Sequence, residues 1–191
     1  ALYLPSTYRA ESEVARRLRE MIDAMPDTMA TDLSAKIDEL ERVEGIAFHA
    51  QQRQAIETAV TSGMTVITGG PGTGKTTIIK CIIKLLSVHG DIALAAPTGR
   101  AAKRMSEATG EEAKTIHRLL EYGGDSGAFA RSEDYPLECD CLIVDEMSMV
   151  DVTLMRGLMR ALRSARSSLV REIPSRSSIC SVSNPSRGSS R

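Results

Sequence analysis

The chain has 191 residues, of which 42% are hydrophobic and 26% are charged, and its formal net charge is −1. These values are typical of a globular protein with room for one domain or slightly more, and they exclude a chain that is basic over its whole surface. Any contact with a nucleic acid therefore needs a local patch, and no apolar run is long enough to predict a membrane-spanning helix.

The first 45 residues predict a helical segment that precedes the main domain. Apolar residues fall on one face of a helix from about Ala10 to a break at Pro26, and again on one face from about Asp32 to Val43. Both patterns are typical of packing helices with solvated charged faces. Because the chain begins with alanine in the middle of a pattern, we expect it to be a piece of a longer protein.

A third helix is predicted from about Ala50 to Thr61, directly before an apolar strand at 64–68. Gln52, near the start of this helix, could present its amide oxygen and NH₂ group to N6 and N7 of an adenine. Spacing alone favours the alternative, which is a solvated glutamine on a helix surface.

The stretch from Gly69 to Thr76 has the spacing of a phosphate-binding loop, G-x-x-x-x-G-K-S/T, between that strand and an apolar helical pattern at 78–86. Glycines let the backbone approach a phosphate closely, and the N–H groups at a helix start attract anions. Lys75 can reach the β- and γ-phosphates, and the Thr76 hydroxyl can bind Mg²⁺. The residues expected to bind ATP are Gln52, Gly70, Pro71, Gly72, Thr73, Gly74, Lys75, Thr76 and Thr77. An ordinary glycine-rich turn is the disfavoured alternative.

An apolar strand at 92–96 leads into residues 97–100, where a helix is expected to begin. Backbone N–H groups and Arg100 could hold a phosphate there, although a capped helix start with a solvated arginine is an equal alternative. His117, at the start of a further short helix, is by itself more typical of a structural histidine. Residues 122–136 are polar and contain glycine, and they predict a surface loop.

A buried strand is predicted at 141–145, and it ends in two carboxylates, Asp145 and Glu146. Asp145 is expected to bind Mg²⁺, and Glu146 could act as the general base that polarises an attacking water. With Lys75 these are the predicted catalytic residues, and Thr76 and Asp145 are the predicted metal ligands. We expect the acidic pair to face Lys75 across neighbouring strands.

The pattern changes after a final helix that Asp151 is expected to cap. Between Ser164 and Arg191, eleven of the 28 residues are serine and five are arginine. This composition predicts a disordered or poorly packed tail, with a basic nucleic-acid-binding tail as the weaker alternative. The four cysteines lack the spacing of a zinc site and predict reduced thiols in a cytoplasmic protein: Cys81, Cys139, Cys141 and Cys180.

Together these motifs resemble those of RecD-like DNA helicases, which are superfamily 1 motors related to the alpha subunit of exodeoxyribonuclease V. The motifs that carry the resemblance are Gln52, the loop from Gly69 to Thr76, Ala96 to Ala102, Thr115 to Leu120 and Ile143 to Asp151. The resemblance covers about residues 1–163. It implies an α/β fold of the RecA-like type, a parallel sheet flanked by helices, with a partial ATP-binding domain at 46–163.

The resemblance also implies a motor that hydrolyses ATP with Mg²⁺ to move 5′→3′ along single-stranded DNA during unwinding and repair. It implies that Gln52 reads adenine and that Asp145 and Glu146 serve the metal and the water. It places the contacts with single-stranded DNA at Pro97, Thr98, Gly99 and Arg100, with His117 nearby. A near-neutral chain is compatible with such contacts, because they are made to the backbone and by stacking.

The chain departs from the family pattern after about residue 163. There the family continues with a further apolar strand, a Gly-Asp…Gln-Leu-Pro motif and a second motor domain with an arginine finger, none of which follows here. We therefore expect a truncated or frame-shifted end, an incomplete sheet and a missing second motor domain. The alternatives are a nucleotide-binding fragment without turnover and an unrelated phosphate-loop ATPase. The sequence does not reveal the oligomeric state.

Overall fold

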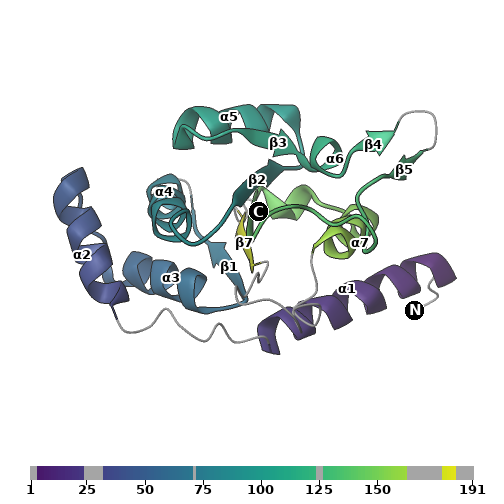
Figure 1. Cartoon of the computed structure of the whole chain (residues 1–191), viewed down its shortest axis with the longest axis horizontal. Helices are drawn as coiled ribbons and strands as arrows, with labels where there is room; N and C mark the ends of the chain where they lie inside the picture. The colour runs from purple at the N-terminus through teal and green to yellow at the C-terminus, as the bar shows by residue number, and fades with distance from the viewer. Residues whose placement is uncertain (1–3, 24–31, 71, 124–126, 163–177, 184–191) are drawn as a thin grey trace, which may run out of the picture.

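The computed structural model describes residues 4–23, 32–70, 72–123, 127–162 and 178–183. Its centre is a parallel, five-stranded sheet (Figure 1). In spatial order the strands are β1 (Met64–Thr68), β7 (Ser178–Ser183), β6 (Cys141–Asp145), β2 (Ile92–Ala96) and β3 (Ala113–Thr115). The strands predicted at 64–68, 92–96 and 141–145 are confirmed, and so is the α/β fold class.

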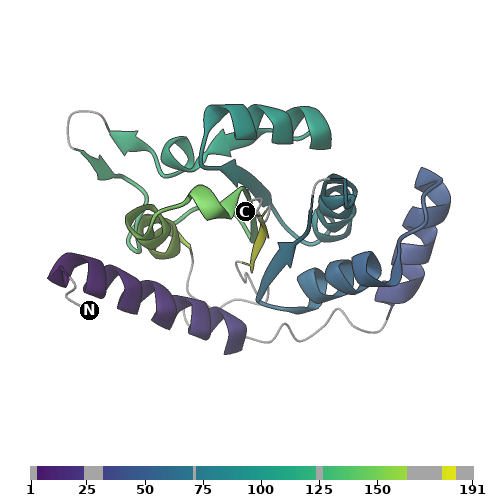
Figure 2. The same ribbon diagram turned by 180° about the vertical axis from the view of Figure 1, so that it is seen from behind.

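Helices lie on both faces of the sheet (Figures 1 and 2). In chain order they are α1 (Pro5–Asp23), α2 (Leu33–Glu44), α3 (Ala50–Thr61), α4 (Lys75–Leu86), α5 (Gly99–Thr109), α6 (Ile116–Leu119), the 3₁₀ helix η1 (Met147–Met149) and α7 (Val152–Ala161). The predicted cap of the last helix is confirmed, since Asp151 Oδ1 accepts hydrogen bonds from two N–H groups of its first turn. Within the described ranges, no helix is both long and apolar enough to span a membrane.

Strand β6 shows how the sheet separates two apolar cores. Cys141 and Ile143 belong to the core that includes residues of α2, α3 and α4, whereas Leu142 and Val144 belong to the core that includes residues of α1, α6 and α7. Alternate residues of a strand point to opposite faces, so both faces of β6 are covered. A strand buried on both faces has to be a continuous apolar run, and that run is the pattern that predicted it.

Three cysteines, Cys81, Cys139 and Cys141, contribute to these buried surfaces. Burial raises the pKa of the Cys81 thiol to about 11. This thiol therefore stays protonated at neutral pH, and a protonated thiol is a poor nucleophile and metal ligand.

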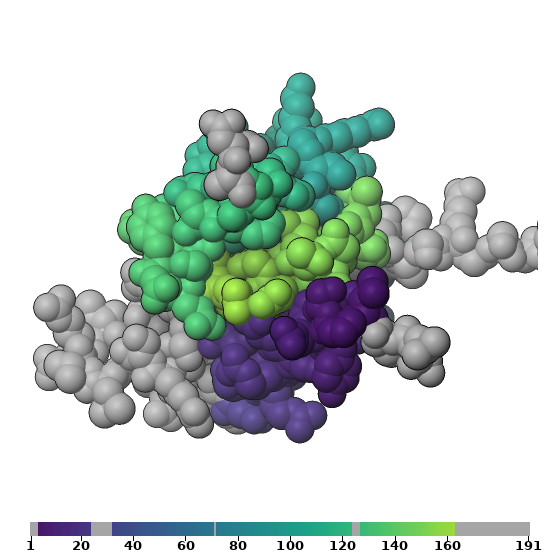
Figure 3. Space-filling view, turned by 90° about the vertical axis from the view of Figure 1, so that its right-hand side faces the viewer, coloured from purple at the N-terminus to yellow at the C-terminus, as the bar shows by residue number. Residues whose placement is uncertain are grey.

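The N-terminal helix α1 packs along α7, as the purple and yellow-green atoms in contact show in Figure 3. The buried Arg17 donates hydrogen bonds to main-chain oxygens at the C-terminal end of α7, with Leu162 O at 2.8 Å from Nη2. Glu13 accepts hydrogen bonds from Arg156 Nε at 2.6 Å and from Arg160 Nε at 2.5 Å. These contacts fix α1 to the domain.

Helix α2 joins the opposite core through Leu33 and Ile37, both of which are buried. The two helices before residue 45 therefore contribute to the same two cores as the sheet. The domain division predicted at residue 45 stays a prediction.

A small hairpin lies within the stretch that the sequence predicts as a loop. Its strands, β4 (Tyr122–Gly123) and β5 (Ala128–Phe129), pair in antiparallel fashion. The rings of Tyr122 and Phe129 are 5.3 Å apart, and the ring of His117 lies 5.7 Å and 6.0 Å from them. Aromatic contacts of this kind stabilise a short hairpin that has few backbone pairs.

Strand β7 comes from the serine-rich stretch for which the sequence predicts disorder. It pairs in parallel with β1 on one side and with β6 on the other. At these six residues the structure differs from the prediction, while residues 164–177 and 184–191 lie outside the described part of the chain. A slot between two parallel strands offers unpaired N–H and C=O groups on both sides, and satisfying them outweighs the modest strand preference of a serine-rich sequence.

Candidate functional site

The loop between β1 and α4 turns on two glycines with positive φ, Gly72 at 77° and Gly74 at 78°. A side chain at either position would be strained. Lys75 Nζ donates to the main-chain oxygens of Gly69 and Gly70, both at 2.6 Å. The ammonium group therefore lies against the loop, where the predicted phosphate-binding role requires it.

Helix α4 begins at Lys75, with Gly74 as its N-cap residue. In the first turn the N–H groups, including those of Thr76 and Thr77, have no acceptor within the helix. Such groups and the helix dipole attract an anion. Pro71, a further predicted loop residue, lies outside the described residues.

A cavity of about 330 Å³ lies beside this helix start. It is lined by Lys75, Thr76 and Ile79 of α4, by Arg104, Met105, Ala108 and Thr109 of α5, and by Asp145 and Glu146 at the end of β6. The three predicted catalytic residues and the predicted threonine ligand thus share one cavity, although the lysine and the acidic pair are 70 residues apart in the sequence. The carboxyl ends of parallel strands are where such sheets usually bind ligands.

The relation between the strands differs from the prediction. Strands β1 and β6 are not neighbours, because β7 lies between them. The expectation that the acidic pair faces Lys75 across neighbouring strands is therefore wrong. The carboxylates nevertheless reach the same cavity, because helix α4 starts at the loop and extends alongside the sheet on the face that carries the α2, α3 and α4 core.

The two carboxylates have different partners. Asp145 Oδ1 accepts a hydrogen bond from the N–H of Glu146 at 2.8 Å, which fixes the orientation of the Asp145 side chain. Glu146 has a positive φ of 54°, and its carboxylate is paired with the guanidinium of Arg104. Positive φ is uncommon for residues other than glycine, and strained backbone of this kind is concentrated at functional sites.

Sequence reasoning did not single out Arg104. It lies four residues after Arg100, so both project from the same side of α5 about one helical turn apart. The spacing of the two arginines could have indicated a shared helix face. That Arg104 pairs with Glu146 at the end of β6 follows only from the fold.

Gln52 contacts the loop rather than the cavity lining. Its Nε2 donates to Thr73 O at 2.9 Å, and its Oε1 accepts from the N–H of His49 at 2.9 Å. A Cβ atom built on Gly74 would meet Gln52 Nε2 at 2.6 Å, so the loop and this amide are closely packed. The side chain thus connects the start of α3 to the loop, and its role toward adenine stays a prediction.

The predicted DNA-contacting residues lie at the same end of the sheet. Thr98 caps α5, since its Oγ1 accepts a hydrogen bond from Ala101 N at 3.2 Å, and Arg100 is exposed in the first turn. The parallel pairing of Ala96 with Thr115 sets the segment from Pro97 to Arg100 beside the chain that leads to His117.

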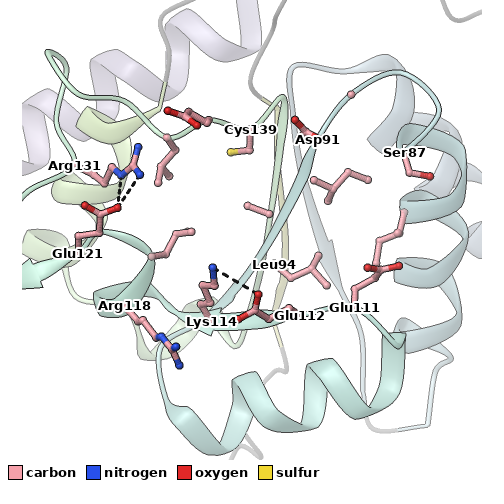
Figure 4. Close-up of a pocket in the computed structure, with 17 residues that line it drawn as sticks. Ser87, Asp91, Leu94, Glu111, Glu112, Lys114, Arg118, Glu121, Arg131 and Cys139 are labelled. Atoms are coloured by element: carbon pink, nitrogen blue, oxygen red, sulfur yellow. Dashed lines mark hydrogen bonds and ion pairs between the residues drawn. The ribbon is translucent and has the colours of Figure 1, made fainter.

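A larger cavity of about 550 Å³ lies at the opposite ends of the strands (Figure 4). Its lining includes Asp91 before β2 and Cys139 before β6, and ion pairs join Arg131 to Glu121 and Lys114 to Glu112. Of the predicted catalytic, nucleotide-binding and DNA-binding residues that the structure describes, none lines it. The smaller cavity beside Lys75 is therefore the candidate site.

Known proteins with similar sequences include several helicases. The ATP-dependent RecD2 DNA helicase of Deinococcus radiodurans is 37% identical over 161 residues, which cover 84% of this chain and 22% of that protein. The RecBCD enzyme subunit RecD of Mycolicibacterium smegmatis is 36% identical over 187 residues, which cover 85% of this chain and 32% of that protein. The chain thus spans less than a third of the length of either relative.

A solved structure of Pif1 helicases at forked double-stranded DNA aligns with 73% of this chain and 34% of that chain, at 20% identity and a TM-score of 0.46. A family model of the AAA domain, AAA_19, matches residues 52–171, which include the loop, the segment after β2 and the acidic pair. Because this match spans more than half of the sequence, the chain belongs to the AAA_19 family of AAA domains.

Proposed function

We propose that the chain is the ATP-binding first motor domain of an ATP-dependent DNA helicase. One observation carries the proposal: Lys75, Thr76, Asp145 and Glu146 line one cavity at the carboxyl end of the sheet, next to an anion-attracting helix start. The names of the relatives, an ATP-dependent RecD2 DNA helicase and a RecBCD subunit, support the assignment.

In this proposal the triphosphate of ATP lies against the start of α4. Lys75 Nζ then exchanges its contacts with loop oxygens for phosphate oxygens, which bind an ammonium more strongly because they are charged. Glu146 accepts the proton of the attacking water. Gln52 holds adenine after its Nε2 leaves Thr73 O.

The donor set suits Mg²⁺. The Thr76 hydroxyl and the Asp145 carboxylate are hard oxygen donors on the wall of the cavity. Among the residues that the structure describes, no group of three or more His, Cys, Asp or Glu side chains could hold a metal ion by itself. In Mg²⁺ sites one or two protein oxygens often act together with phosphates and water, and the bound ion neutralises phosphate charge.

The proposed nucleic-acid partner is single-stranded DNA. Pro97, Thr98, Gly99 and Arg100 would contact its backbone, and His117 with its aromatic neighbours would lie beside them. Movement in the 5′→3′ direction and a role in repair belong to this proposal through the family resemblance alone. The cytoplasmic location and the second motor domain outside this chain stay predictions.

A nucleotide-binding unit without turnover of its own is the second candidate. The observation that favours it is the engagement of Glu146 by Arg104, which occupies the carboxylate that the reaction needs. An arginine finger supplied from elsewhere contributes about 10³–10⁵ in rate in related chemistry, so binding without turnover is a realistic outcome for the isolated chain.

Hydrolysis of ATP with and without an oligothymidylate tests the proposal in the full-length protein that contains this chain. We expect Mg²⁺-dependent hydrolysis that single-stranded DNA stimulates. Binding of a fluorescent ATP analogue by the isolated chain, without turnover, would support the second candidate for that chain. Hydrolysis that is indifferent to DNA in the full-length protein would favour an unrelated phosphate-loop ATPase.

A further inference from the structure

The ion pair between Arg104 and Glu146 joins two parts of the proposed motor that have different tasks. Glu146 follows β6 and faces the cavity, whereas Arg104 belongs to α5, the helix whose first turn carries the predicted DNA-contacting residues. The pair is therefore a direct physical contact between the proposed DNA-binding helix and the proposed general base.

The Glu146 carboxylate does not have the orientation that hydrolysis requires. A carboxylate that pairs with a guanidinium has one oxygen directed at that group rather than at a water near the phosphate. The positive φ of Glu146 sets the direction of its side chain just after the strand ends, so a modest change there re-aims the carboxylate. The Glu146 side chain is 25% exposed, which leaves room for such a change.

Helix α5 is suited to transmit a displacement. Ala101, Ala102 and Met105 are buried, whereas Arg104 is exposed and borders the cavity beside Met105. Arg100 and Arg104 are one turn apart, about 6 Å along the axis, so a shift of the first turn moves both. Because the Arg104 side chain is 61% exposed, its pairing is of the weak, reversible kind.

We propose that Arg104 is a positioning residue that holds Glu146 away from the attacking water until single-stranded DNA engages the first turn of α5. The proposal rests on the proposed function of the cavity and adds to it a link between DNA binding and hydrolysis. When DNA shifts α5, the guanidinium releases the carboxylate, and Glu146 turns to the water. Hydrolysis is then restrained in the absence of DNA.

The test compares Arg104→Ala, Arg104→Lys and Lys103→Ala in the full-length protein, with ATP hydrolysis measured with and without an oligothymidylate. Lys103→Ala is the matched control, since it also removes one positive charge from the exposed side of α5, and Lys103 pairs only loosely with Glu107 at 3.8 Å. We expect Arg104→Ala to raise the DNA-independent kcat about two- to fivefold, which corresponds to about 0.4–1 kcal/mol. The DNA-stimulated kcat should be nearly unchanged, so the stimulation ratio falls.

Arg104→Lys and one further variant show whether the effect acts through Glu146. Arg104→Lys keeps a cation and should restore most of the restraint, and Glu146→Gln combined with Arg104→Ala should abolish the raised rate. A DNA-independent rate that is unchanged in Arg104→Ala, with DNA stimulation intact in the unaltered protein, would overturn the proposal. A fall in both rates together with weaker ATP binding would also overturn it, because Arg104 would then be a phosphate contact.

Failure of the proposed function gives a different result. If the unaltered full-length protein shows no hydrolysis, or hydrolysis that DNA does not change, the helicase assignment is wrong. The proposed role of Arg104 is then wrong as well. Thermal unfolding of every variant checks that the fold is kept. If Arg104→Ala and Lys103→Ala have equal melting temperatures, a difference between their rates of ATP hydrolysis comes from the contact with Glu146 and not from lost stability.

Discussion

The position of the Lys75 side chain follows from a local sequence motif. Its ammonium lies 2.6 Å from two loop oxygens, and in the proposed function phosphate oxygens replace these partners. The motif predicts this position because its glycines, its lysine and the following helix start form one local unit. Arg104 could not be predicted in the same way, because its partner Glu146 lies 42 residues further along the chain.

The first prediction concerns Lys75→Ala. The substitution removes a charge-assisted hydrogen bond to phosphate, so binding of an ATP analogue should weaken by about 1.5–3 kcal/mol. Lys80→Ala is the matched control, since it removes one charge from the exposed side of the same helix. Fluorescence titration of both variants measures the difference, and equal affinities would remove Lys75 from the nucleotide site.

At the scale of elements, the contact between α1 and α7 is the feature that the sequence least predicts. The apolar stripe of α1 predicts a packing helix, and the structure confirms one. The stripe does not say which helix it meets, because many apolar faces are equivalent partners. The choice of α7 is fixed by Glu13 and Arg17, which have partners more than 140 residues away at α7 and its end.

Arg17→Ala tests this contact. The substitution leaves carbonyl groups at the end of α7 without their buried donor, so the free energy of unfolding should fall by about 1–3 kcal/mol. Arg19→Ala, which changes an exposed residue two positions away, should change it by less than about 0.5 kcal/mol. Urea unfolding followed by circular dichroism gives both values. A loss as small as that of the control would mean that α1 does not depend on Arg17 for docking.

The pH dependence of stability follows from Glu13. Burial raises the pKa of this carboxyl, but hydrogen bonds and charges from Arg160 and Arg156 outweigh burial, and the net pKa is lowered. A lowered pKa in the folded state means that the unfolded chain takes up the proton first. The contribution of Glu13 is therefore complete above about pH 4.3, the ordinary pKa of a glutamate, and is lost as the pH falls through the lower folded value.

Urea unfolding at several pH values between about 3 and 7 measures this contribution. The stability of Glu13→Gln should be lower than that of the unaltered chain at neutral pH, and the two should converge as the pH falls. A constant difference across this range would show that the carboxylate charge of Glu13 does not stabilise the contact.

At the scale of the whole molecule, the sheet could be predicted only in part. Strands β2 and β6 are predictable because burial on both faces demands apolar runs, whereas β1, which leaves Val66 exposed, is predictable from the β-branched run before the loop. β7 could not be predicted, because its place depends on the slot between two other strands rather than on its own composition. The sequence therefore predicts correctly that the site lies at the carboxyl end of the sheet. It predicts wrongly that β1 and β6 are adjacent strands, because β7 lies between them.

The position of β7 predicts strong protection of its backbone. Amide hydrogen exchange at 178–183 should be slow, as in the strands on either side, since β7 pairs with β6 over residues 178–182 and with β1 over residues 179–183. Removal of residues 164–191 should lower the stability and speed exchange in β1 and β6. Fast exchange at 178–183 in the unaltered chain would show that these residues do not fill the slot, and it would favour the predicted disorder.

The most direct test of the central claim is an experimental structure of the chain with Mg²⁺ and a non-hydrolysable ATP analogue. We predict that the terminal phosphates lie within hydrogen-bond distance of Lys75 Nζ and that Mg²⁺ is bound by oxygens of Thr76 and Asp145. A nucleotide bound in the larger cavity at the other end of the strands, or one beside Lys75 with Asp145 turned away from its metal, would contradict it.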